Sequence, residues 1–304
     1  CYSTAHTHEE SPARGAEKLM KKVSSAVKGA NPEAVVRVED VCSDYLMQYI
    51  DDTWIKTFEG GDTFGRQFDI YSVHFLRFYF PEIKYTEWGS TFEDGARRAF
   101  FSGVGYLRGD LPNFKEEVEY LAETGQVLKE NGDAIASLNP EPLVDTLRER
   151  VYANRFPIDN KVLYTLYNKN AEVINGEIIA VEHKPGWHYV ELLYDEEPAV
   201  NTADNSELLS LSIKPWDVVS IAQLPSLMNV IRRGDILEID IDEKVKAPVI
   251  KAYINSDSWE SKCLDGAVKG GKAVVNLQNA EHGKLVIKLF EKGYLRDEVV
   301  LNQK

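Results

Sequence analysis

Hydrophobic positions in the first part of the chain recur with helical and strand-like spacing in turn. Apolar residues three or four positions apart predict amphipathic helices. We place one of about four turns from Pro12 onward, and two more at 90–107 and 113–131. Two short runs rich in β-branched or aromatic residues, 34–38 and 83–89, have the composition of strands buried in a parallel sheet. Helices that alternate with strands in this way are typical of βα units.

Three further segments of this part have mixed patterns. Residues 44–58 combine Leu, Tyr, Ile and Trp with carboxylates and are expected to be helical. The aromatic run 73–80 is expected to be a strand that ends at Pro81, and residues 142–151 a last short helix. With two or three strands in all, this part has too few βα units to close a sheet or barrel by itself.

The period of the pattern changes after Phe156–Pro157. Short strands follow, separated by Asn-Gly, Pro-Gly and Asn-rich turns. We place these strands at 161–168, 177–183, 188–194, 208–213 and 217–222. Strands at such intervals predict an antiparallel β-sandwich.

A second β-module is expected after a linker at 223–227. We place its strands at 235–241, 248–254, 272–277, 284–290 and 298–301. The length of this module is that of an immunoglobulin-like domain. The predicted fold class is therefore α/β plus all-β, with domains at 1–155, 156–222 and 223–304.

Composition excludes some classes of partner. The chain has 304 residues, a net charge of −14 and a pI of about 5.0, so neither a nucleic-acid backbone nor an anionic membrane surface is expected as its main partner. No apolar run approaches the ~20 residues of a membrane-spanning helix, so no transmembrane segment is expected. The three cysteines lie far apart, and the sequence shows neither the ligand spacing of a metal site nor a cofactor motif.

Carboxylates follow the predicted strand 34–38. Glu39 and Asp40 stand where this strand ends, and in α/β sheets and barrels the loops after the carboxyl ends of strands build the site. Glu39 is therefore the first candidate for a catalytic carboxylate, and Asp40 and Asp44 are the alternates. The other interpretation is a salt-bridged strand end for Glu39 and a helix N-cap for Asp44.

Aromatic and histidine side chains near other strand ends are candidates for sugar contacts. Glu87 and Trp88 close the strand 83–89, where an indole can stack on a pyranose ring and a carboxylate can bind its hydroxyls. The alternative is a Trp that lines an interface between barrel and helices. His6 and His8 are two positions apart in a polar segment, where both could contact a sugar hydroxyl. The alternative is that both are solvent-exposed loop residues without a role in binding.

Four stretches also resemble segments of a known family. The motif C-Y-S-T-A-H-T-H at 1–8 is similar to the end of a late barrel strand, and N-P-E-A-V-V-R-V-E-D-V-C-S-D-Y at 31–45 to the strand after it. R-F-Y-F-P-E-I-K-Y-T-E-W-G at 77–89 resembles the last barrel strand, and R-F-P-I-D-N-K-V-L-Y-T-L-Y-N at 155–168 the entry into a β-sandwich. The family comprises large bacterial glycoside-hydrolase-like proteins, distantly similar to the α-galactosidase and endo-α-N-acetylgalactosaminidase clan.

The resemblance implies the last third of a (β/α)8 barrel followed by two antiparallel β-sandwich modules. A complementary N-terminal barrel portion or chain would lie outside these residues. The implied activity is a glycoside hydrolase, secreted or at the bacterial cell surface, that acts on a carbohydrate with paired carboxylates and no cofactor or metal. One of the two carboxylates would lie outside this segment. The implied catalytic residues are Glu39 and Asp44, and the implied substrate-binding residues are His6, His8, Asp40, Tyr45, Glu87 and Trp88.

A second hypothesis fits the same sequence. It is a non-catalytic carbohydrate-binding surface lipoprotein, with Cys1 as the lipidated residue and the β-modules as the binding part. Cys1 would then be the first residue of the mature chain, whereas on the first hypothesis it is an interior residue of a longer one.

Overall fold

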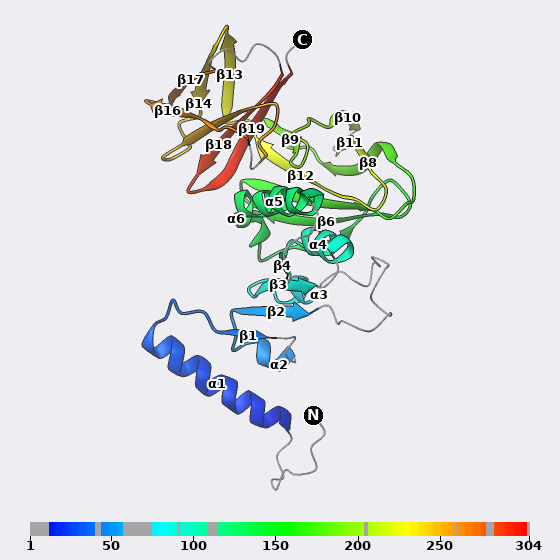
Figure 1. Cartoon of the computed structure of the whole chain (residues 1–304), viewed down its shortest axis with the longest axis vertical. Helices are drawn as coiled ribbons and strands as arrows, with labels where there is room; N and C mark the ends of the chain where they lie inside the picture. The colour runs from blue at the N-terminus through cyan, green and yellow to red at the C-terminus, as the bar shows by residue number, and fades with distance from the viewer. Residues whose placement is uncertain are drawn as a thin grey trace.

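The computed structural model describes residues 12–39, 44–56, 75–89, 92–108, 115–203, 206–258, 261–277 and 283–302. Three parts follow one another along the long axis of the molecule (Figure 1). An α/β part lies at the N-terminal end, two β-sheets with covering helices lie in the middle, and a curled antiparallel sheet lies at the C-terminal end. Within the described ranges, no helix has both the length and the apolar character needed to cross a bilayer.

The α/β part contains a parallel sheet in the order β1-β2-β3-β4. Its described strands are β1 (Arg37–Glu39), β2 (Asp52–Lys56), β3 (Lys84–Gly89) and β4 (Gly105–Arg108). The helices of this part are α1 (Pro12–Ala30), α2 (Asp44–Met47), α3 (Phe75–Tyr79) and α4 (Phe92–Phe101). Apolar residues from these helices, the loops and the strands form one core on a single face of the sheet.

Several expectations for this part were wrong. The segment 44–58 is helical only in α2 and then enters β2, whose Thr53, Trp54 and Ile55 suit a strand that pairs on both sides. The run 73–80 contains α3 instead of a strand. Leu76 and Phe80, four residues apart, pack against the apolar core of this part, and buried Arg77 donates to the carbonyl of Ile135. The expected helix 90–107 ends at Phe101 and is followed by β4.

The middle part is built on a sheet whose two faces are both covered. As far as the structure describes it, the strand order is β5-β6-β7-β12-β9, and the sheet β10-β11-β8 packs against it across a shared apolar core. The strands are β5 (Glu141–Val144), β6 (Val151–Ile158), β7 (Lys161–Asn168), β8 (Ile174–Glu182), β9 (Trp187–Glu191), β10 (Ala199–Ala203), β11 (Ser206–Ile213) and β12 (Val218–Pro225). All eight residues of β7 are buried.

Helices cover the opposite face of this sheet. Residues of α4, α5 (Lys115–Glu130) and α6 (Gly132–Ile135) join side chains of β6, β7 and β12 in a second core. Phe290 and Leu295 of the C-terminal part complete it. The middle sheet therefore touches both neighbouring parts of the chain.

The C-terminal part is a single antiparallel sheet in the order β13-β14-β17-β16-β15-β18-β19. Its strands, within the described residues, are β13 (Met228–Arg233), β14 (Ile236–Ile241), β15 (Val249–Ile254), β16 (Leu264–Lys269), β17 (Lys272–Asn276), β18 (Lys284–Glu291) and β19 (Tyr294–Asn302). The sheet curls until its edge strands β13 and β19 come into contact. It is thus close to a closed barrel, and the expected immunoglobulin-like sandwich is not what these residues form.

The first β-sheet begins earlier in the chain than expected. The segment 142–151 contains β5 and a turn instead of a helix, and β5 pairs with β6 at Glu141 and Arg155. Strand β6 runs across the expected domain limit between residues 155 and 156. Leu143 and Arg150 have positive φ angles of 54° and 57°, a conformation that interrupts a helix at both ends of this segment.

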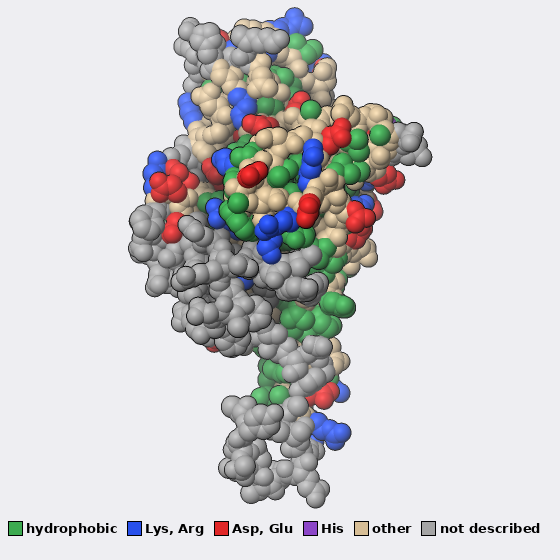
Figure 2. Space-filling view, turned by 90° about the vertical axis from the view of Figure 1, so that its right-hand side faces the viewer, with side chains coloured by type: hydrophobic (Ala, Val, Ile, Leu, Met, Phe, Trp, Pro, Cys, Tyr) green, Lys and Arg blue, Asp and Glu red, His purple; other side chains and the backbone are tan. Residues whose placement is uncertain are grey.

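Two buried side chains tie the middle and C-terminal parts together. Lys161 on β7 donates to Asn131 at 3.1 Å and to the carbonyl of Leu295 at 2.9 Å, which links the middle sheet to the α5–α6 junction and to β19. Asp297 on β19 accepts hydrogen bonds from the backbone N–H groups of Leu227 and Met228 and contacts His188 Nε2 at 2.7 Å. On the side shown in Figure 2, acidic and basic side chains are interspersed over the middle part.

Candidate functional site

The face of the parallel sheet that the helices do not cover carries side chains in rows. Residues paired in register on neighbouring parallel strands point to the same face. One row runs Glu39, Trp54, Thr86 and Gly105 from β1 to β4. Leu107, two residues after Gly105 on β4, is 41% exposed, so this face is open at its far side as well.

Glu39 is the last residue of β1 and lies on this open face. Its side chain is exposed, and its register partner on β2 is the partly exposed Trp54. The guanidinium carbon of Arg37 lies 5.6 Å from the centroid of the Trp54 ring, on the side of the amino end of the strands. The indole therefore has a cation over its ring, and the strand position beside it belongs to Glu39.

A charged row lies next to it, toward the amino ends of the strands. Arg37, Asp52 and Lys84 are register partners, and Arg37 forms an ion pair with Asp52 Oδ2. Asp52 is 8% exposed, and its Oδ1 has no hydrogen-bond partner within the described residues. Burial, together with the nearby Arg77 guanidinium, lowers the pKa of Lys84. The open face is thus polar and charged at its base.

Glu87 lies on the opposite face of the sheet. Its side chain is fully buried and bonds with both Arg98 Nε, at 3.3 Å, and Arg98 Nη2 on α4. Burial lowers the pKa of Arg98 to about 10. This geometry fixes α4 on the sheet, and it turns the Glu87 carboxylate away from the row that contains Glu39.

The remaining expected site residues are placed only in part or not at all. Trp88 belongs to β3, in register with Lys56 and Leu107, on the same face as Glu39. Asp44 and Tyr45 begin α2, after the loop that follows β1. The structure describes the backbone of these three residues but not their side chains, and His6, His8 and Asp40 lie outside the described residues. Their roles stay predictions.

Trp54 is the site residue that sequence reasoning missed. The segment 44–58 was predicted to be helical, whereas Asp52, Trp54 and Lys56 share one face of β2 by their spacing of two. That spacing of polar and aromatic residues was the available signal. The residues described contain no group of three His, Cys, Asp or Glu side chains arranged to hold a metal ion.

Comparisons with known proteins find similar solved structures but do not assign the chain to a family. No family model matches the chain, and no curated protein matches it significantly. Among solved structures, the chain is similar to a GH30 endoxylanase from Clostridium papyrosolvens, with 10% identity, a TM-score of 0.40 and coverage of 72% of this chain and 62% of the other. It is also similar to an Anoxybacillus α-amylase, with 11% identity, a TM-score of 0.47 and coverage of 69% and 56%.

A Thermotoga maritima α-fucosidase is a third such structure, with 12% identity, a TM-score of 0.36 and coverage of 69% of this chain and 49% of the other. The chain thus spans less than two thirds of each of these enzymes. All three are glycoside hydrolases, but scores below 0.5 at such low identity do not assign an activity to this chain.

Proposed function

We propose that the open face of the parallel sheet, at the carboxyl end of β1, binds a saccharide and cleaves its glycosidic bond. The observation that supports this most is the register pairing of Glu39 with Trp54, an exposed carboxylate beside a partly exposed indole. An indole offers a flat apolar surface for the C–H face of a pyranose ring. A carboxylate next to it is within reach of the ring's hydroxyls or its glycosidic oxygen.

The chemistry requires two carboxyl groups, one on each side of the bond. One of them, in its protonated form, gives its proton to the glycosidic oxygen, which keeps the electron pair of the broken C–O bond. A water molecule supplies the oxygen that ends on the anomeric carbon, and a carboxylate of the pair accepts the proton that this water loses. In our proposal Glu39 is one member of this pair, as acid/base or as a sugar-binding carboxylate. The second member belongs to a complementary barrel portion that completes the site.

The direct test uses the protein as it is purified from its source, with any chain that accompanies it. Hydrolysis of a panel of 4-nitrophenyl glycosides is compared between the wild type, Glu39→Gln and the matched control Glu33→Gln, which alters an exposed residue in the loop before β1. General acid–base catalysis contributes about 10²- to 10⁴-fold, so Glu39→Gln should lower kcat by at least about 10²-fold while Glu33→Gln leaves it unchanged.

Two outcomes contradict the proposal. One is equal activity of Glu39→Gln and wild type, which removes the acid/base role. The other is the absence of hydrolysis of every glycoside by the wild type together with saturable sugar binding that Trp54→Ala abolishes. That second result supports the carbohydrate-binding hypothesis, in which the same row of residues holds a sugar and no bond is broken.

A further inference from the structure

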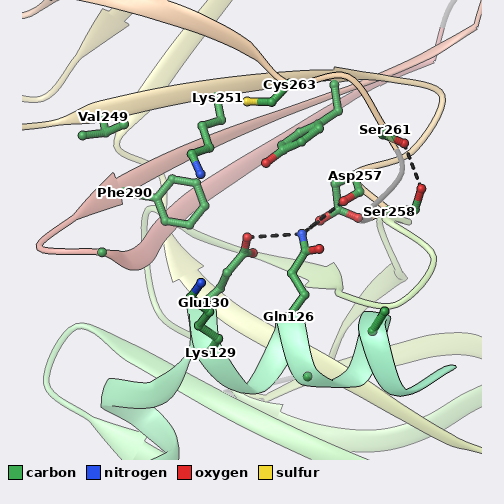
Figure 3. A pocket seen from close by; sticks show the side chains of 14 residues that line it. Gln126, Lys129, Glu130, Val249, Lys251, Asp257, Ser258, Ser261, Cys263 and Phe290 are labelled. Carbon is green, nitrogen blue, oxygen red and sulfur yellow. Dashed lines mark hydrogen bonds between the residues drawn. The ribbon is translucent and has the colours of Figure 1, made fainter. Parts of the chain in front are cut away.

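A pocket lies between α5 and the C-terminal part (Figure 3), and no residue of the parallel sheet lines it. Helix α5 contributes Gln126, Lys129 and Glu130 to its walls, and the C-terminal part contributes Lys251 and Phe290 among others. Its volume is about 560 Å³, within the roughly 300–1,000 Å³ of small-molecule sites. The walls therefore come from two parts of the chain that are distant in sequence.

One end of the pocket is cationic and aromatic. Lys251 Nζ lies 5.3 Å from the centroid of the Phe290 ring. In Figure 3, Lys129 reaches toward the same end from α5. Among the described residues, neither the Lys129 nor the Lys251 ammonium has a carboxylate within ion-pair distance. Two unneutralised cations beside a ring form a receptor for an anion with an adjoining carbon framework.

The other end of the pocket offers hydrogen-bonding groups of both kinds. Gln126 Nε2 donates to Asp257 Oδ2 at 2.9 Å and to Glu130 Oε1 at 3.3 Å. The hydroxyls of Ser258 and Ser261 are 2.9 Å apart. Figure 3 shows the polar ends of Gln126 and Asp257 turned toward the same space as that of Glu130. Groups that both donate and accept suit the hydroxyls of a ligand.

The negative charges of the pocket's carboxylates are partly neutralised by a buried lysine behind the pocket wall. Lys288, 1% exposed, lies 2.9 Å from Glu130 Oε2, pairs with Asp257, and lies 3.4 Å from Glu298. Burial raises the pKa of Glu298 above its usual value, which favours its neutral form. The negative charge behind the wall is therefore reduced, and the charges of Lys129 and Lys251 remain available to a ligand.

We propose that this pocket binds a sugar acid. The ligand's carboxylate lies between Lys129 and Lys251 at the Phe290 end. Its ring hydroxyls bond with Gln126, Asp257 and Ser258 at the other end. This binding site is separate from the open face with Glu39, and the proposal does not depend on glycoside cleavage there.

The test uses two ligands that differ only in the group in question: methyl β-D-glucuronide, which carries a carboxylate, and methyl β-D-glucoside, which carries CH₂OH instead. Affinities for the full chain are measured by saturation-transfer NMR titration. The glucuronide should show saturable binding that is at least about tenfold tighter than that of the glucoside, the difference expected for charge-assisted hydrogen bonds.

Variants locate the binding. Lys251→Met should weaken glucuronide binding about tenfold or more and remove the preference over the glucoside. Lys129→Met, at an exposed position of α5 where folding is not at risk, should do the same to a smaller extent. Lys269→Met, on an exposed position of β16, is the matched control and should change nothing.

Three results would overturn the sugar-acid site: no saturable binding of the glucuronide, equal affinity for both ligands, or a loss in Lys269→Met as large as in Lys251→Met. Since the readout is binding at this pocket, activity at the open face does not enter into any of these outcomes.

Discussion

At the scale of residues, the buried ion pair between Glu87 and Arg98 is a sensitive point of the α/β part. Both side chains are almost wholly buried, and each serves as the other's charged partner across the β3–α4 contact. Removing one partner of such a pair leaves an uncompensated charge inside the protein, which costs about 3–5 kcal/mol. Replacing both with apolar residues of similar size costs far less.

We therefore expect Arg98→Met to lower the free energy of unfolding by about 3–5 kcal/mol. The double variant Glu87→Leu/Arg98→Met should recover most of this loss. Urea denaturation followed by circular dichroism measures both. If the double variant is as unstable as Arg98→Met alone, the loss comes from packing and not from the unpaired carboxylate.

A second buried carboxyl group makes stability depend on pH. Glu191 accepts hydrogen bonds from the N–H groups of Leu193 and Tyr194, yet burial dominates and raises its pKa from 4.5 to about 8. Between these two values the folded protein keeps the proton and the unfolded chain does not. The stability from this group is therefore full below about pH 4.5 and is lost as the pH rises through about 8.

Glu191→Gln removes this titration and keeps one oxygen, which can still accept from one of the two N–H groups. The free energy of unfolding of this variant should fall less steeply than that of the wild type between pH 5 and pH 8. Chemical denaturation at several pH values gives the two slopes. Glu149→Gln, at an exposed position, should keep the wild-type slope; parallel curves for Glu191→Gln and wild type would show that Glu191 titrates alike in both states.

At the scale of elements, the end of α4 is the joint between the α/β part and the middle sheet. The carbonyl of Phe101 accepts hydrogen bonds from Asn154 Nδ2 at 2.8 Å and from Thr165 Oγ1 at 2.6 Å. Two residues later Gly103 turns the chain with a φ of +64°. A Cβ at this position would lie 2.9 Å from the ring of Phe156 and 3.0 Å from Ile135, so glycine is required both for its backbone angle and for its size.

Gly103→Ala is accordingly expected to destabilise the protein by about 1–3 kcal/mol. Gly125→Ala is the matched control, because this glycine lies within α5 and a Cβ there meets nothing within 4 Å. The control should stabilise by about 0.5–1 kcal/mol through its better helix propensity. Thermal denaturation of the two variants should thus shift in opposite directions, and a shift in the same direction would contradict the steric argument.

Helices and strands differ in how clearly the sequence predicts them. Elements with one clear period were predicted closely: α5 occupies most of 113–131, and β7 has the predicted bounds of 161–168. Strand β13 was missed because none of its residues is fully buried and it carries Arg232 and Arg233, as edge strands often do. Helix α3 was missed because its aromatic residues favour strands locally and only tertiary packing makes them helical.

The candidate site was predictable to a lesser extent. The position of Glu39 at the end of β1 followed from the strand pattern, and the structure places it on the open face. The side of the sheet on which Glu87 lies depends on register and on the partner Arg98, which is 11 residues away in sequence. Neither the pairing of Trp54 with Glu39 nor the pocket beside α5 is local in sequence, so no pattern along the chain showed them.

At the scale of the whole molecule, the middle and C-terminal parts are expected to unfold together. Asp297 on β19 is fully buried. Its carboxylate bonds with the N–H group of Leu227 and with His188 on β9. Asp297→Ala leaves buried donors without an acceptor, at about 1–3 kcal/mol for each group. In calorimetry we expect one transition for these parts in the wild type and one transition at a lower temperature in the variant.

Asp297→Asn is the milder comparison, because its amide oxygen can still accept from the N–H groups of Leu227 and Met228, which share one oxygen of Asp297. Its transition should lie between those of wild type and Asp297→Ala. A separate transition for the C-terminal sheet in the wild type would contradict the coupling through Lys161 and Asp297.

The covering of α4 by strands that come later in the chain has a consequence for biosynthesis. Thr165, which bonds with the carbonyl of Phe101, follows it by 64 residues. Ribosomes add roughly 5–20 residues per second, so this interval lasts about 3–13 seconds. During that time the rings of Phe100 and Phe101, both buried in the finished protein, lack the sheet that covers them. A nascent chain halted in this interval is therefore a substrate for chaperones that bind aromatic side chains.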